Sequence, residues 1–196
     1  TLNLNGRLLT LDEPRVMGIL NVTPDSFFDG GQYDSVTSAV AQTGRMLDEG
    51  AAIIDVGGMS SRPGAKVITP QEEQERVLPV ITAIAGTYPE AHISIDTVYA
   101  TTARAAVEAG AGMVNDISAG RLDDTMYETV AELGVPYCLM HMQGRPETMQ
   151  ERPDYEDVVQ EVLDFFIAET EHLRALGATD IVLDPGFGFG KNIDHN

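Results

Sequence analysis

Most apolar segments of this chain end in a side chain that forms hydrogen bonds. The residues at these positions are acidic or amide residues and one histidine: Asn21, Asp55, Asp96, Asn115 with Asp116, His141 and Asp184. Asn and Asp also begin ordinary turns, so a single such position is weak evidence of a site. Asp96 and Asp184 are stronger candidates, because both are embedded in apolar sequence, where an unpaired carboxylate is costly to bury.

Three of these side chains suggest a class of ligand. Asp96, Asn115 and Asp184 together supply several acceptors and one amide. Such a set suits a flat heterocycle with an amino-amidine edge, whose N–H donors can meet a carboxylate in pairs. A pterin and a guanine both have this edge, so the residues indicate the ligand chemistry without its identity.

Two segments are longer than the usual connection of about 2–6 residues between a strand and a helix. They cover 21–35 and 57–70, and both mix Gly and Pro with charged and hydroxyl residues. Long loops in this position often act as lids. Within the second, Ser60, Ser61 and Arg62 offer hydroxyls and a guanidinium that can hold phosphate oxygens. Phe187 and Phe189 lie in a glycine-rich turn and either pack on a rim or wall a ring-binding pocket.

The elements that must position these residues alternate regularly. Strands are predicted at 16–21, 52–58, 92–97, 112–118, 136–142 and 180–186. Helices are predicted after a cap at Ser35, after the Thr69–Pro70–Glu72 capping box, over 98–109, from Met126 to Gly134, and over 154–176. This order indicates a parallel sheet with helical crossovers. An open doubly wound sheet and a (β/α)8 barrel, typically of about 250 residues, both remain open at this point.

Composition excludes several classes of protein. The 196 residues carry a net charge of −19, which argues against a nucleic-acid partner. No apolar run approaches the roughly 20 residues of a membrane span, so no membrane association is expected. Cys138 is the only cysteine and predicts a core side chain in a cytoplasmic protein; His141 is expected to be a rim or core residue.

Six segments in order carry a resemblance to a known family. They are NVTPDSF at 21–27, SRPGA at 61–65, SIDT at 94–97, NDI at 115–117, LMHMQGRPETMQ at 139–150 and LDPGFGFGK at 183–191. Together they resemble the dihydropteroate synthase family, from Val16 to Asn196. The resemblance implies an α/β fold, a (β/α)8 TIM barrel with about six strands and five helices present. It implies a single pterin-binding barrel domain over 1–196 that is C-terminally incomplete, since the family's later Ser-Arg-Lys and Arg-x-His stretches are absent.

The resemblance also implies an activity. Family members are transferases that join 6-hydroxymethyl-7,8-dihydropterin diphosphate to 4-aminobenzoate, giving 7,8-dihydropteroate and diphosphate for folate biosynthesis; sulfonamides target them. We expect an SN1-like substitution with Mg2+. A homodimer is implied, although its interface helices are absent here. Two alternatives are a non-catalytic pterin-binding paralogue or fragment, and the pterin domain of a folate-dependent methyltransferase, which lacks both loop motifs.

The resemblance assigns roles to individual residues. Catalytic roles fall to Asp96, Arg62, Asp25 and Asp29, and the residue associated with Mg2+ is Asn21. Substrate binding is expected from Ser61, Arg62, Pro63, Asp96, Asn115, Ile117, Met140, Asp184, Phe189 and Phe27. The chain departs from the family where Met59 replaces a Glu, Ser61 a Thr, and Phe28 a small residue.

Overall fold

The computed structural model describes residues 1–23, 31–59, 68–144, 149 and 153–196. Within these ranges it contains a six-stranded parallel sheet, a two-stranded antiparallel hairpin and five helices. The predicted alternation of strands and helices is therefore confirmed.

The strands of the sheet follow one another in chain order. Their bounds are β3 (Val16–Asn21), β4 (Ala51–Gly57), β5 (His92–Asp96), β6 (Met113–Asp116), β7 (Tyr137–Met140) and β8 (Ile181–Asp184). Each is parallel to its neighbour in the order β3-β4-β5-β6-β7-β8. In a doubly wound sheet the order of the strands reverses at a switch point, whereas in a TIM barrel each strand lies beside the next one along the chain. The observed order is that of the barrel.

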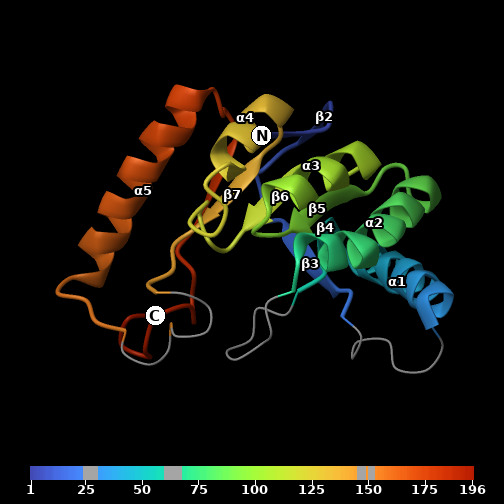
Figure 1. Cartoon of the computed structure of the whole chain (residues 1–196), viewed down its shortest axis with the longest axis horizontal. Helices are drawn as coiled ribbons and strands as arrows, with labels where there is room; N and C mark the ends of the chain where they lie inside the picture. Colours follow the sequence, from blue (N-terminus) through green and yellow to red (C-terminus); the bar gives the residue numbers. More distant parts are fainter. Residues whose placement is uncertain (24–30, 60–67, 145–148, 150–152) are drawn as a thin grey trace.

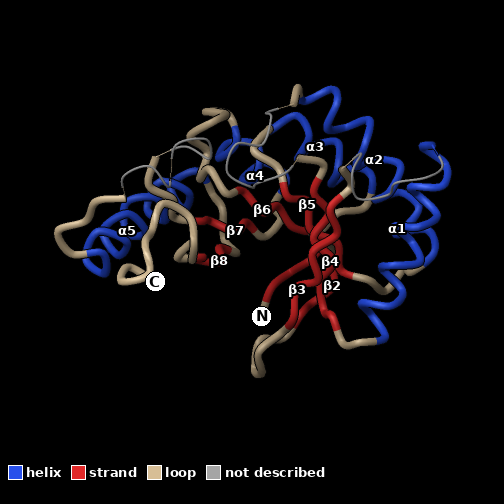
Figure 2. Tube along the Cα trace, turned by 90° about the horizontal axis from the view of Figure 1, so that it is seen from below, coloured by secondary structure: helices blue, strands red, loops and turns tan. Residues whose placement is uncertain are grey.

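The helices lie on the outer side of the curved sheet (Figure 2). They are α1 (Gly31–Asp48), α2 (Pro70–Thr87), α3 (Ala100–Ala109), α4 (Met126–Leu133) and α5 (Val158–Leu176). The larger part of the core lies between the sheet and these helices, and includes Ile54, Ile95 and Leu139 from the strands. Figure 1 shows α5 standing apart from the other four helices.

Local signals set the helix ends, with two corrections. The Thr69 capping box is confirmed, because Thr69 accepts from Glu72 N while the Glu72 carboxylate accepts from Thr69 N. Helix α1 begins at Gly31 rather than at Ser35, since a serine inside a helix costs little and does not end it. Helix α5 begins at Val158 rather than at 154, because Asp157 caps it by accepting from Val159 N and Gln160 N.

An N-terminal hairpin that we did not predict closes one end of the barrel interior. Strands β1 (Leu2–Leu4) and β2 (Arg7–Leu9) are joined by Asn5 and Gly6, which have φ values of 53° and 82°. Leu2, Leu4 and Leu9 pack against inward residues of the sheet, among them Met113 and Cys138. Cys138 is thus a core residue, as expected. No helix within the described ranges has the length and apolar character that a bilayer crossing requires.

Candidate functional site

Four of the polar residues near the strand ends lie on the inner face of the sheet. Because side chains alternate along a strand, Asp55, Asp96, Asn115 and Asp184 all point away from the helices. Asp96 of β5 pairs directly with Asn115 of β6, and Asp184 of β8 pairs with Met140 of β7. These residues lie toward the carboxyl ends of the strands, where barrel enzymes place their sites.

Asp96 is an unusual carboxylate. Burial, and then the negative charges of Asp55, Glu73 and Asp116, raise its pKa well above the ordinary value of 3.8. Its side chain packs over Gly57, where an added Cβ would lie 3.2 Å from Asp96 Oδ2. Asp96 therefore gains from any ligand that brings N–H donors or positive charge to it.

The side chain of Asn115 is held by a hydrogen bond to a second acid, Asp55. Its Nδ2 donates to Asp55 Oδ2 at 2.8 Å, across the intervening strand β5. Asp55 is only 4% exposed, and burial raises the pKa of its carboxyl, while Ser94 and Asn115 partly offset this. Side chains of alternate strands share a layer in a TIM barrel, which explains how β4 and β6 come into contact.

Asp116 has a different role from its neighbour Asn115. It points to the helical side and accepts from Ser118 N, Ser118 Oγ, Gly120 N and the Tyr137 hydroxyl, at 2.7–2.8 Å. Burial raises the pKa of its carboxyl and these hydrogen bonds partly offset the shift. With both oxygens engaged by the protein, Asp116 stabilises the turn after β6 and has no oxygen to spare for a ligand.

An apolar wall stands beside the carboxylates. Ile117, Met140 and Phe189, predicted as pocket walls, belong to one cluster. Val98, Met142 and Met149 are buried in it, and Met59 and Tyr99 pack against it. Acceptors beside a flat apolar wall form the kind of site that a planar heterocycle fills.

The glycine-rich turn after β8 is built against the end of β7. Gly186 N donates to Asp184 Oδ1 at 2.8 Å, which orients that carboxylate. Gly186 has a φ of 68°, and an added Cβ would lie 2.1 Å from the His141 carbonyl oxygen. Only glycine fits there, since the neighbour is backbone. This contact places Asp184 next to Met140.

Sequence reasoning missed Lys191, which follows this turn and is 5% exposed. Its Nζ lies 3.0 Å from His141 Nδ1 and donates to three carbonyl oxygens, of His141, Gly186 and Phe189, at 3.2–3.3 Å. Burial lowers the pKa of Lys191, while the negative charge of Asp184 opposes the shift. A lysine directly after a run of glycines was the available signal. His141 itself is 7% exposed, so its predicted place at the rim or core is confirmed.

Asn21, expected near a metal ion, lies exposed at the end of the edge strand β3. It lines a hollow of about 430 Å³ together with Ser38, Gln42 and Arg45 of α1. Within the described ranges, His, Cys, Asp and Glu side chains form no group of three or more that could hold a metal ion.

The remaining predicted site residues are Asp25, Phe27, Asp29, Ser61, Arg62 and Pro63, and all lie outside the described residues. The described residues on either side of 60–67 are tied to the barrel. Arg76 of α2 donates to the Gly58 carbonyl at 2.9 Å, and the Tyr99 hydroxyl donates to the Ile68 carbonyl at 2.7 Å. Gly58 is thus held by α2, and Ile68 by the residue that precedes α3.

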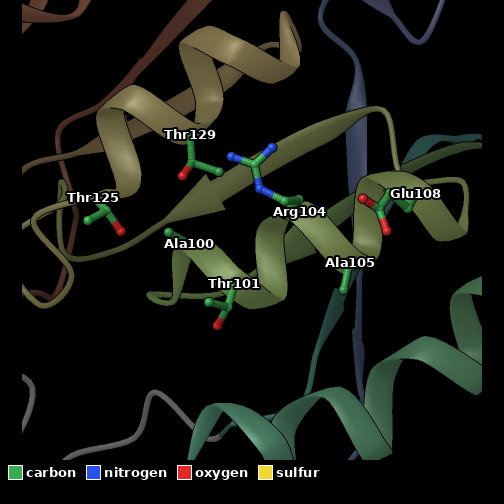
Figure 3. A pocket seen from close by; sticks show the side chains of 7 residues that line it. All are labelled: Ala100, Thr101, Arg104, Ala105, Glu108, Thr125 and Thr129. Atoms are coloured by element: carbon green, nitrogen blue, oxygen red, sulfur yellow. The ribbon is translucent and has the colours of Figure 1, made fainter.

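A further depression, of about 220 Å³, lies in the helical layer. Figure 3 shows its lining, which comes from α3 and from the start of α4 and the residue before it. Arg104 in this lining pairs with Glu132 at 2.6 Å. The depression opens between helices, on the opposite side of the sheet from Asp96 and Asn115, and is separate from the strand-end site.

Comparison with known proteins gives one consistent family. Residues 17–196 match the family model described as pterin binding enzyme. The dihydropteroate synthase of Escherichia coli K12 is 49% identical over 193 residues, which cover 97% of this chain and 68% of that protein.

Two solved structures agree with this result. The dihydropteroate synthase of Xanthomonas albilineans with 4-aminobenzoic acid has a TM-score of 0.90 at 46% identity, covering all of this chain and 69% of its own. That of Yersinia pestis in a sulfonamide drug complex has a TM-score of 0.90 at 45% identity, covering all of this chain and 70% of its own. The fold, the strand-end carboxylates and these similarities lead to one conclusion: the chain belongs to the dihydropteroate synthases, transferases of the pterin-binding enzyme family.

Proposed function

We propose that the strand-end site binds the dihydropterin diphosphate substrate and that the condensation with 4-aminobenzoate takes place beside it. The main support is that Asp96, Asn115 and Asp184 lie on the inner face of the sheet. The apolar residues Ile117 and Met140 lie next to them. The carboxylates and the amide accept the ring N–H groups, and the apolar side chains pack on the ring face.

In the reaction, the C–O bond between the exocyclic CH2 and the diphosphate breaks, and a C–N bond to the arylamine forms. The amine loses one proton and diphosphate leaves. An SN1-like path creates positive charge on the pterin ring, and the negative charge of Asp96 and Asp184 stabilises it. Water would compete with the amine, so exclusion of water by the two long segments favours the correct product.

The leaving diphosphate needs local neutralisation on a chain of net charge −19. Mg2+ usually binds through one or two protein oxygens together with substrate phosphates and water. Asn21 offers one such oxygen, exposed at the end of β3, so the donor chemistry fits an ion carried by the substrate. When bound, the ion would neutralise charge on the diphosphate. By residue type, Ser61 and Arg62 are proposed to hold diphosphate oxygens, and Asp25, Phe27, Asp29 and Pro63 to act with them in substrate binding. Phe189 is proposed as the wall of the 4-aminobenzoate site.

Turnover measured with and without Mg2+ tests this account. The chain is incubated with the dihydropterin diphosphate and 4-aminobenzoate, and dihydropteroate is quantified by mass. We expect product that depends on Mg2+, and a larger Mg2+ requirement in Asn21→Ala. A rate independent of Mg2+ would overturn the metal assignment and leave the pterin site standing.

We also infer that residues 1–196 act as a single domain, that the protein is cytoplasmic and that it forms the homodimer known in its family. The hairpin packed into the barrel supports a single domain. Sedimentation at several concentrations tests the dimer, and a monomer throughout would overturn that inference.

A further inference from the structure

Asp55 is a buried acid that lies beneath the proposed pterin site and has no role in the function proposed above. Asp55 Oδ2 accepts from Asn115 Nδ2 at 2.8 Å. Its other oxygen, Oδ1, is fully enclosed and makes no hydrogen bond of normal geometry within the described residues, and the same holds for Ser94 Oγ on the paired strand. A carboxylate is expensive to keep in such a place, and buried apolar residues are found on the same inner face of the sheet: Ile53, Met113 and Cys138.

The hydrogen bond restricts Asn115 to one orientation. A carboxamide can rotate by half a turn and exchange its oxygen and its NH2 group. In the rotated state of Asn115, the amide oxygen would face the Asp55 carboxylate, and two acceptors would be in contact. Asp55 therefore determines that the NH2 group of Asn115 faces the Asp55 carboxylate and that the amide oxygen remains for a ligand.

We propose that Asp55 is a positioning residue for the pterin: it fixes the Asn115 carboxamide in the single orientation that matches the donor and acceptor pattern of the ring edge. This inference rests on the proposed pterin site. It adds a residue that acts through Asn115 and need not touch the substrate. The benefit is that the amide is already oriented before the ligand arrives, so binding does not have to select one of two states.

The substitution Asp55→Asn separates orientation from hydrogen bonding. An asparagine at 55 can accept from Asn115 in one state and donate to it in the other, so the pair keeps a hydrogen bond but loses its direction. The probe is 6-hydroxymethylpterin, titrated by calorimetry into the unsubstituted chain, Asp55→Asn, Asn115→Ala and the double variant. We expect the dissociation constant to rise about tenfold in Asp55→Asn, which is the scale of one hydrogen bond.

The double variant distinguishes positioning from a general effect. If Asp55 acts through Asn115, then Asp55→Asn has no further effect once Asn115→Ala is present. Asp124→Asn is the control for the loss of one negative charge, because Asp124 is an exposed acid: we expect it to leave the pterin dissociation constant unchanged.

Three outcomes would overturn the inference. The first is an unchanged dissociation constant in Asp55→Asn, beside an unsubstituted chain that binds. The second is an equal loss in the presence and absence of the Asn115 side chain, which would assign the effect to the charge next to Asp96. The third is absence of pterin binding by the unsubstituted chain, which would overturn the proposed site and this inference together.

Discussion

The Lys191 ammonium lies 3.0 Å from His141 Nδ1, where the turn after β8 meets the end of β7. An ammonium can only donate, so this contact requires the imidazole tautomer that accepts at Nδ1; the three N–H groups of the ammonium are shared among Nδ1 and the nearby carbonyl oxygens. The same ammonium donates to the Gly186 and Phe189 carbonyls. The buried Lys191 charge thus connects the turn that contains Gly186 and Phe189 to the end of β7, the strand that carries Met140.

This contact predicts the titration of His141. Burial, and then the positive charges of Lys191 and Arg121, lower the pKa of His141 to about 4. We expect Lys191→Met to raise that pKa, although it stays below 6.5 because burial is the larger cause. The variant also leaves buried carbonyls without a donor, at a cost of about 1–3 kcal/mol in unfolding free energy. NMR titration of the imidazole checks the first statement and urea unfolding the second. A His141 that titrates normally in the unsubstituted chain would contradict the contact.

Two glycines of the same turn form a matched pair. Gly186 and Gly188 both have positive φ, of 68° and 80°, so Ala at either costs about 1–2 kcal/mol. At Gly188 an added Cβ meets nothing within 4 Å, whereas at Gly186 it meets the His141 carbonyl. We expect Gly186→Ala to lower the unfolding free energy clearly more than Gly188→Ala, and to weaken pterin binding because the Gly186–Asp184 hydrogen bond shifts. Equal losses in urea unfolding would show that the turn does not pack on β7 in this way.

The raised pKa of Asp96 predicts how the unfolding free energy depends on pH. Its folded-state pKa lies well above 3.8, so between those values the folded chain keeps a proton that the unfolded chain has lost. The folded state binds more protons there, and the unfolding free energy falls as the pH rises through this window. Glu73 and Asp55, whose pKa values are also raised by burial, act in the same direction.

Urea unfolding at about pH 5 and about pH 8 measures this slope. We expect Asp96→Asn to flatten it, by on the order of 1.4 kcal/mol for each unit of pKa shift removed. The exposed residue Asp124 gives a control of equal charge, and Asp124→Asn should flatten the slope much less. If both variants flatten it equally, net charge and not the environment of Asp96 controls the effect.

The thiol of Cys138 is expected to react much more slowly in the folded chain than in the unfolded chain. It is 7% exposed, and burial and nearby carboxylates such as Asp184 and Asp55 raise the pKa of its thiol to about 12. The thiolate is the reactive form, so a disulfide reagent at neutral pH should leave the folded chain unmodified and label it rapidly in denaturant. Rapid labelling of the folded chain would mean that the hairpin does not cover the barrel interior.

Much of this fold follows from local sequence signals. The apolar runs predict the six strands to within two residues, and the Thr69–Glu72 pair predicts the start of α2, because both depend on near neighbours in the chain. The hairpin was also within reach: Asn5-Gly6 between short apolar runs is a strong signal for a two-residue turn. Its strands have three residues each, which is too short to show the alternation of apolar and polar residues that indicates a strand.

The contacts that organise the site could not be predicted in the same way. Asp55 and Asn115 are 60 positions apart and meet only because the stagger of a barrel brings alternate strands into one layer. Lys191 and His141 are 50 positions apart and meet through the path of a turn. Sequence reasoning therefore singled out Asp96, Asn115 and Asp184, which lie at the carboxyl ends of their strands, and missed the residues that hold them in place.

The most direct test of the account is the initial rate of 7,8-dihydropteroate formation by the unsubstituted chain, Asp96→Asn and Asp124→Asn. If Asp96 stabilises the positive charge that develops on the pterin, its variant should be slower by about a hundredfold or more, with the unfolded fraction unchanged. Asp124→Asn should match the unsubstituted chain. No product from the unsubstituted chain, or equal rates in all three, would contradict the account.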